Sequence, residues 1–287
     1  MPSPTLADAL CNAVAQLAPL HGSARLDAEL LLAAALEQPR SYLYAWPERA
    51  LTATQSQRFN AFVARRAAGE PIAHLLGRRE FWSLALEVTP DTLIPRPETE
   101  LLVESALARI PGAAHWHIAD LGTGSGAVAL ALGHERPRCR VDASDLSAAA
   151  LAVAERNARR LDLHNLGFHL GAWYAAFAGQ RFDVIVSNPP YVRADDPHLN
   201  EGDARFDPRC ALVAGHDGLG DLRQIIAGAP GHLLPGGWLL VEHGYDQGPA
   251  VAELFTQAGF LAVHTHPDLA GHPRVTEGQR ALSSASA

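Results

Sequence analysis

The sequence predicts an α/β protein in which a small all-helical domain precedes a parallel sheet with helices on both faces. Apolar residues recur at helical spacing through residues 1–70, without an intervening strand pattern. From His115 onward, short apolar runs alternate with helical segments, and this alternation is typical of a parallel sheet. A glycine-rich turn follows the first of these runs, where such sheets place a strand-to-helix connection.

Three helices are predicted in the first domain, residues 1–70. The first begins at Thr5, a residue type that caps helix N-termini. The second covers residues 25–37 and ends before Pro39, and the third covers residues 52–68. Acids and arginines balance across the domain, so it is electrically neutral. A neutral helical domain without a catalytic motif indicates a docking element for a protein partner rather than for a nucleic-acid duplex.

Residues 71–92 are predicted to form a β-hairpin linker, because residues 81–88 alternate partly between apolar and polar side chains. The second domain is predicted over residues 93–280, and its first helix over residues 101–110. A Ser/Ala tail after Leu282 is expected to fray. The expected strands cover residues 117–121, 140–145, 166–170, 182–187, 237–242 and 260–264, and the expected helices cover residues 127–134, 148–161, 222–229 and 251–258.

Composition narrows the class of protein. Apolar residues make up 48% of the 287 residues, enough for a large core. The net charge of −8 argues against a protein that binds mainly nucleic-acid phosphates. All 23 basic residues are arginine, which excludes a Schiff-base or P-loop lysine. The three cysteines are far apart and the histidines are scattered, so no metal site is expected.

The start of the chain lacks the basic-then-apolar pattern of a signal peptide, and no run approaches the roughly 18 apolar residues of a membrane span. We therefore expect a cytoplasmic protein that has no membrane partner and no direct nucleic-acid partner, and that acts as a monomer.

The sequence Ser187-Asn188-Pro189-Pro190-Tyr191 follows the predicted strand 182–187. Neither proline has an N–H for a strand ladder, and each pushes the preceding residue toward extended geometry. We expect a stiff corner at the carboxyl end of a strand, where open α/β sheets bind ligands. The Asn188 amide, the Pro189 carbonyl and the Tyr191 ring suit a flat group that carries an NH2. An ordinary strand exit is about as compatible with these residues alone.

The glycine-rich turn contains Gly122, Gly124 and Gly126 and lies between a strand and a helix. Glycines there let a ligand approach the backbone closely and leave helix N–H groups free to bind it. Asp145 ends the next strand, where it could accept hydrogen bonds from ribose hydroxyls. These residues fit a nicotinamide-dependent dehydrogenase and an S-adenosylmethionine (SAM) methyltransferase equally well.

Three features favour the methyltransferase. Asp120 precedes the glycines, where a carboxylate could hold the ammonium of a methionine moiety, although it could also be a turn residue. Trp173 follows the third strand, where an indole could stack on adenine or simply fill the core. The corner at Asn188 has no use in hydride transfer.

Together these residues resemble the class I SAM-dependent amino-methyltransferases, and more closely the peptide chain release factor N5-glutamine methyltransferases, the PrmC/HemK family. Asn-Pro-Pro-Tyr alone is shared with DNA and some ribosomal RNA enzymes, whereas the Pro-Arg-Pro-Glu-Thr-Glu stretch is more specific. The resemblance covers nearly the whole chain and is carried by Ile94-Pro-Arg-Pro-Glu-Thr-Glu100, Asp120-Leu-Gly-Thr-Gly-Ser-Gly126, Ser187-Asn-Pro-Pro-Tyr191, Arg205-Phe-Asp-Pro208 and Glu242-His-Gly244.

This resemblance implies a class I SAM-methyltransferase, Rossmann-like sheet in the second domain. It implies that the substrate is the glutamine of the Gly-Gly-Gln motif in class I release factors, held by Asn188, Pro189, Pro190 and Tyr191. Of these, Asn188, Pro189 and Tyr191 would be catalytic. The residues expected to bind SAM are Asp120, Gly122, Thr123, Gly124, Ser125, Gly126, Asp145, Trp173 and Asn188.

Two positions depart from the family pattern. Ala172 stands where members often carry an acid, which puts a contact to the adenine amino group in doubt. Glu277 stands where an apolar residue is usual. The alternatives are a nucleic-acid amino-methyltransferase, which usually brings a basic recognition domain, a methyltransferase acting on a ribosomal-protein glutamine, and a nicotinamide-binding oxidoreductase or non-catalytic nucleotide-binding module.

Overall fold

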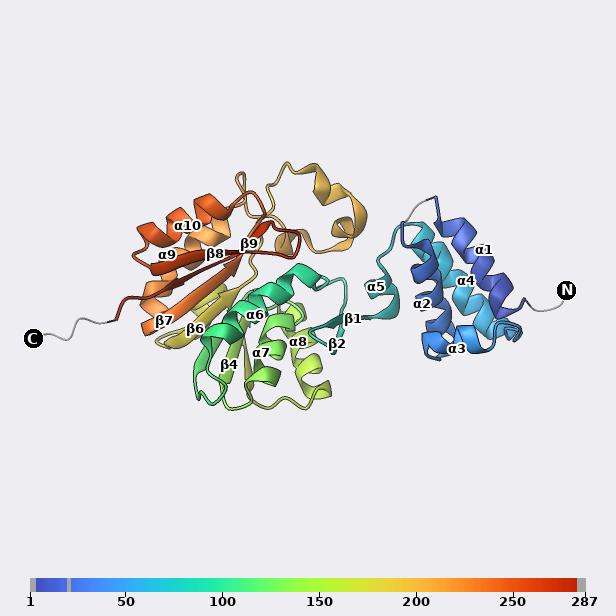
Figure 1. Ribbon diagram of the computed structural model, residues 1–287, viewed down its shortest axis with the longest axis horizontal. Coiled ribbons are helices and arrows are strands. Elements are labelled where there is room, and N and C mark those ends of the chain that lie inside the picture. The colour runs from blue at the N-terminus through green and yellow to red at the C-terminus, as the bar shows by residue number, and fades with distance from the viewer. Residues whose placement is uncertain (1–3, 20–21, 283–287) are drawn as a thin grey trace, which may run out of the picture. The chain divides into compact units, whose positions relative to one another are not determined.

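The computed structural model describes residues 4–19 and 22–282, which fold as two compact units (Figure 1). The first unit runs to Arg78 and also takes in Asn200–Phe206, and the second holds Arg79–Leu199 and the chain from Asp207 onward. The limits predicted from the sequence, 1–70, 71–92 and 93–280, stay a proposal about how the chain is organised. The Ser/Ala tail after Leu282 lies outside the described residues.

The first unit contains the three predicted helices and two short ones. Thr5 and Thr52 cap the first and third predicted helices through reciprocal capping boxes, as residues of this type do. The two added helices, α3 and α5, are too short for an apolar period to reveal them. The helices of this unit are α1 (Leu6–Leu17), α2 (Ala24–Leu36), α3 (Arg40–Ala45), α4 (Ala53–Ala67) and α5 (Ile72–Leu76).

The second unit confirms the predicted strand and helix alternation. A hairpin of β1 (Arg78–Phe81) and β2 (Leu84–Glu87) comes first. The sheet strands are β3 (His117–Leu121), β4 (Arg140–Asp145), β5 (Leu166–Leu170), β6 (Phe182–Ser187), β7 (Leu233–Glu242), β8 (Leu261–Pro267) and β9 (Pro273–Gln279). The helices are α6 (Glu100–Arg109), α7 (Ala127–Glu135), α8 (Ala148–Arg160), α9 (Gly220–His232) and α10 (Gly248–Gln257), with short 3-10 helices such as η1 (Pro97–Thr99).

The sheet has the order β5-β4-β3-β6-β7-β9-β8, in which β9 runs antiparallel to both of its neighbours. Consecutive residues of each central strand point into different cores. Ile118 and Val184 face the core shared with α6 and α7, whereas Ala119 and Ile185 face the core shared with α9 and α10. Helices therefore cover both faces of the sheet, as predicted (Figure 1).

The strand β9 is absent from the sequence-based prediction because its charged and glycine residues resemble a loop. Its Glu277 is nevertheless fully buried, and Arg109 of α6 donates to both of its carboxylate oxygens. A buried ion pair with good geometry lets a charged residue occupy a position inside a sheet. The ion pair also accounts for an acid where the family usually has an apolar residue.

In the part of the chain that the structure describes, no helix is long and apolar enough to cross a membrane. Among the same residues, no group of three or more His, Cys, Asp or Glu side chains is arranged to hold a metal ion.

The side chain of Asn157 on α8 links the hairpin to the glycine-rich turn. It is almost fully buried, and its Nδ2 donates to the carbonyls of Glu87 and Ser125, each at 3.0 Å. Its Oδ1 accepts from the Glu87 N–H at 2.7 Å. Both N–H donors of this amide and one of the two acceptor sites on its oxygen are thus used. The position of the turn depends on one side chain that sequence patterns do not single out.

We expect Asn157→Ala to lower the free energy of unfolding of the second unit by about 2–4 kcal/mol, because it leaves partly buried backbone groups without partners. Urea unfolding followed by tryptophan fluorescence measures this change. Gln257→Ala, at an exposed position on α10, is the matched control and should change stability by less than about 0.5 kcal/mol. Equal effects of the two substitutions would contradict the role given to Asn157.

Candidate active site

The candidate site lies at the carboxyl ends of the central strands of the second unit. The strand β3 pairs in parallel with β4 on one side and with β6 on the other, so the chain reverses its direction of winding there. Open α/β sheets bind ligands at this switch point. The Ser187 hydroxyl at the end of β6 donates to the Leu121 carbonyl at the end of β3, at 2.7 Å. This bond fixes the two strand ends next to each other.

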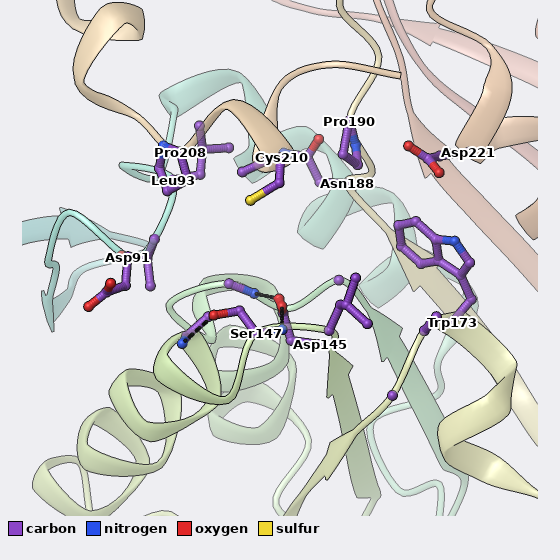
Figure 2. Close-up of a pocket in the computed structure, with 18 residues that line it drawn as sticks. Asp91, Leu93, Asp145, Ser147, Trp173, Asn188, Pro190, Pro208, Cys210 and Asp221 are labelled. Carbon is purple, nitrogen blue, oxygen red and sulfur yellow. Dashed lines mark hydrogen bonds between the residues drawn. The ribbon is translucent and has the colours of Figure 1, made fainter. Parts of the chain in front are cut away.

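A cavity of about 460 Å³ opens at this point, which is within the size range of small-molecule sites. Figure 2 shows Asn188 and Pro190 on the wall opposite Asp145, with Trp173 at one side between them. Six of the sequence-predicted site residues line this cavity: Gly122, Gly124, Asp145, Trp173, Asn188 and Pro190. The fold thus brings together residues from four segments that are separate in the sequence.

The glycine-rich turn has the backbone that its sequence predicts. Gly122, Gly124 and Gly126 have φ of +74°, +57° and +87°, a region that favours glycine. The Asp145 carboxylate organises the turn, because its Oδ2 accepts from the Gly124 N–H at 2.9 Å and its Oδ1 accepts from the Ser147 N–H at 2.8 Å. Both oxygens keep further acceptor capacity toward the cavity.

Trp173 lies against the glycine turn. A Cβ added at Gly122 would come within 3.0 Å of the indole carbon Cζ3, so the ring occupies the space that a side chain would need. The backbone of Trp173 itself has a φ of +46°, which an indole-bearing residue rarely adopts. The main chain is therefore held in a costly conformation that places the indole on the cavity wall.

Asp120 lies behind the glycine turn instead of lining the cavity. Its Oδ2 accepts from the Thr123 hydroxyl at 2.6 Å and from the Ala129 N–H at 3.2 Å. Burial raises the pKa of this carboxyl to about 7. Thr123, Ser125 and Gly126 also lie outside the cavity lining, and all three are buried. The sequence-based role of Asp120 as a ligand for an ammonium group stays a prediction, and its observed contacts support the turn.

A second, smaller cavity of about 50 Å³ adjoins the corner after β6. Pro189 and Tyr191 line it, and Asn188 is common to both cavities. Its lining also includes Arg96, which forms an ion pair with the buried carboxylate of Asp207. The same carboxylate accepts from the Ile94 N–H at 3.1 Å. Two stretches that the resemblance singled out are thus joined to each other next to this cavity.

Hydrogen bonds fix the side chains of the corner. The Nδ2 of Asn188 donates to the Thr99 hydroxyl oxygen at 3.1 Å, which leaves the amide oxygen as the group free to accept. The Tyr191 hydroxyl donates to Glu242 Oε1 at 3.1 Å. Burial raises the pKa of Tyr191, so its hydroxyl keeps its proton and can donate.

Sequence reasoning missed several residues that the structure places here. Thr99 and Glu242 lie within stretches quoted for the resemblance, but no role was assigned to them. Cys210 and Asp221 line the larger cavity from segments that carried no motif. For Asp221 no pattern in the sequence gives a signal, because only the fold brings the start of α9 to the cavity.

The second unit has the fold of the class I methyltransferases. A solved methyltransferase from Pyrococcus furiosus matches 76% of this chain and 98% of its own, with a TM-score of 0.53 and 19% identity. The T. thermophilus 16S rRNA N2 G1207 methyltransferase, in complex with AdoMet and guanosine, also gives a TM-score of 0.53, with 18% identity over 71% of this chain and 49% of its own. At such identities the likeness establishes the fold alone.

Sequence comparisons identify the family. Residues 8–77 match the PrmC N-terminal domain, and residues 97–203 match the methyltransferase small domain. The release factor glutamine methyltransferase of Pseudomonas aeruginosa is 58% identical over 257 residues, which cover 90% of this chain and 93% of the relative. That of Vibrio cholerae is 51% identical over 261 residues, 90% of each chain. The chain belongs to the release factor glutamine methyltransferase family.

Proposed function

We propose that this protein transfers a methyl group from SAM to the side-chain amide nitrogen, N5, of the glutamine in the Gly-Gly-Gln motif of class I peptide chain release factors. The observation that carries the proposal is the position of Asn188, which lines both the larger cavity and the small one. A residue placed there can contact a target group in the small cavity while the cofactor occupies the large one. Membership of the family supports the choice of substrate.

The larger cavity fits SAM in size and in chemistry. Its volume of about 460 Å³ suits a ligand of this class. The Asp145 carboxylate can accept from ribose hydroxyls, the Trp173 indole offers an aromatic face, and the backbone at Gly122 and Gly124 lets a ligand approach closely. When bound, SAM supplies a methyl group on a positively charged sulfur, which is activated for transfer.

The corner residues would orient the target amide. An amide nitrogen is a poor nucleophile because its lone pair is delocalised into the carbonyl group. The Asn188 side-chain oxygen and the Pro189 carbonyl would accept its two N–H bonds and turn the lone pair toward the methyl group. The Tyr191 ring, fixed by the bond to Glu242, would pack on the flat amide. Orientation of this kind lowers a barrier by several kcal/mol.

The same two oxygens would stabilise the positive charge that develops on nitrogen during transfer. The extra proton can leave to water after the methyl group has moved, so the corner needs no general base. This accounts for a site in which the groups at the corner are an amide, a carbonyl and a phenol rather than a histidine or a carboxylate.

The direct test is mass spectrometry of a purified class I release factor after incubation with this protein and SAM. We expect one added methyl group on the motif glutamine, and none on a release factor in which that glutamine is replaced by asparagine. Parallel incubations with DNA and with ribosomal proteins separate the alternative substrates. Methylation of either of these, with the release factor left unmodified, would overturn the proposal.

We expect Asn188→Asp to slow methylation by at least about 100-fold while SAM affinity, measured by calorimetry, stays within a few-fold. A carboxylate cannot donate to Thr99 and adds a negative charge near Glu242. Asn188→Ala, which removes the acceptor as well, is the matched comparison. A rate near that of the unmodified protein for the Asp variant would contradict the mechanism.

We also propose that the first unit docks the release factor. It exposes two large aromatic side chains close in sequence, Tyr44 and Trp46, with exposed fractions of 59% and 52%. Exposed aromatic residues often anchor a protein partner. The absence of a charge excess in this unit fits a protein partner.

We therefore expect Trp46→Ser to raise KM for an intact release factor about 5- to 30-fold, a loss of roughly 1–2 kcal/mol of binding. Methylation of a short Gly-Gly-Gln peptide should not change. Steady-state kinetics with both substrates measures the difference, and Leu26→Ser at another exposed apolar position serves as a control. An equal rise in KM for the short peptide would argue against docking by Trp46.

A further inference from the structure

The carboxylate of Glu242 lies at the end of β7, beneath the corner formed by Asn188 and Tyr191. Only 1% of the residue is exposed, and burial makes an ionised carboxylate costly unless it is fully hydrogen-bonded. Its Oε1 accepts from the Tyr191 hydroxyl, whereas its Oε2 has no hydrogen-bond partner within residues 4–19 and 22–282. A stable core would place an apolar residue here, so the carboxylate requires a functional reason.

The hydrogen bonds around Glu242 have a defined direction. Asn188 Nδ2 donates to Thr99 Oγ1, so the Thr99 hydroxyl proton points to another acceptor. The Thr99 hydroxyl lies close enough to the Glu242 carboxylate to lower its pKa, as the Tyr191 hydroxyl does, although only the Tyr191 hydroxyl forms a hydrogen bond with it. An ionised carboxylate can only accept hydrogen bonds. It therefore fixes the direction of the Tyr191 hydroxyl. Its Oε2, which has no partner among the described residues, offers the acceptor that the Thr99 hydroxyl proton needs, and a bond there would fix which end of the Asn188 amide faces away from the cavities.

We propose that Glu242 is a positioning residue for methyl transfer: acting through Thr99, it holds the Asn188 amide with its oxygen toward the target NH2, and it holds the Tyr191 ring directly. The inference rests on the proposed function, because the amide orientation matters only for a substrate that donates N–H bonds. A protonated Glu242 can donate to Thr99. The Thr99 hydroxyl is then free to donate to Asn188, and the amide no longer has one preferred orientation.

Several neighbours decide when Glu242 is ionised. Burial and, to a smaller extent, Glu98 in η1 raise its pKa to about 7, although Thr99, Tyr191 and Arg274 of β9 act to lower it. The active form is the ionised one. Since the pKa in the folded protein lies above the ordinary value, the ionised fraction and the transfer rate should both fall as pH drops through about 7.

Glu242→Gln tests the inference by keeping the shape of the side chain and removing its charge. We expect kcat for release factor methylation to fall about 10- to 100-fold, with KM and SAM affinity within about threefold of the unmodified protein. The acidic limb of the pH profile should disappear. Thr99→Val should lower kcat in the same range, and Thr99→Ser, which keeps the hydroxyl, should restore most of it.

Glu277→Gln is the matched control, because it also neutralises a buried carboxyl in the same sheet but lies outside the corner. We expect it to lower the melting temperature and to retain the acidic limb. Were Glu242→Gln to fail to fold, Thr99→Val would carry the kinetic test. An unchanged kcat in that variant, or an acidic limb that persists in a folded Glu242→Gln protein, would overturn the inference.

A second readout does not depend on activity. The side-chain ¹⁵N–H₂ resonances of Asn188, assigned by comparison with Asn188→Ala, should shift with pH around a midpoint near 7 in the unmodified protein. They should not titrate in Glu242→Gln. If the Asn188 resonances of the unmodified protein do not shift with pH, the inference is refuted even if release factor methylation is confirmed. If the Asn188 resonances titrate as expected but no release factor is methylated, the proposed function is refuted, whereas the coupling between Glu242 and Asn188 stands.

Discussion

The structure depends on the way in which β6 stops. Two consecutive prolines cannot continue a strand ladder, so the chain must turn at Asn188. The Ser187 hydroxyl ties this turn to the end of β3, where the glycine-rich turn begins. The carboxyl ends of two neighbouring strands thus hold the two halves of the site, the larger cavity and the corner, in a fixed relation. Asn188, at the start of the corner, lines both cavities.

Buried polar groups then set the orientation of the corner. Thr99 and Glu242 come from segments far apart in the sequence, and they meet Asn188 and Tyr191 beneath the site. A similar arrangement holds the glycine turn, where Asp120 accepts from the Thr123 hydroxyl and Asn157 donates to the Ser125 carbonyl. In both places the groups facing the cavities are held by a second layer of hydrogen bonds, which is how a site keeps a geometry suited to transfer.

Much of this could be predicted from the sequence. The glycine turn, Asp145 and the Asn188 corner belong to local patterns whose backbone requirements are strong, and the structure brings them together. The strand β9 was missed because the ion pair that buries Glu277 involves Arg109, which is far away in the chain. The contacts of Asp120 with Thr123 and Ala129 could not be predicted, since position in a motif does not reveal which way a side chain points. The roles of Thr99, Glu242 and Asp221 depend on tertiary neighbours that no local pattern encodes.

The central claim is that the corner holds a planar amide by two oxygen acceptors. A crystal structure of this protein with S-adenosylhomocysteine and a Gly-Gly-Gln peptide tests it most directly. The account predicts the glutamine side chain in the small cavity, with its nitrogen within about 3 Å of both Asn188 Oδ1 and the Pro189 carbonyl oxygen. A glutamine bound elsewhere, or an Asn188 amide turned away from that nitrogen, would contradict it.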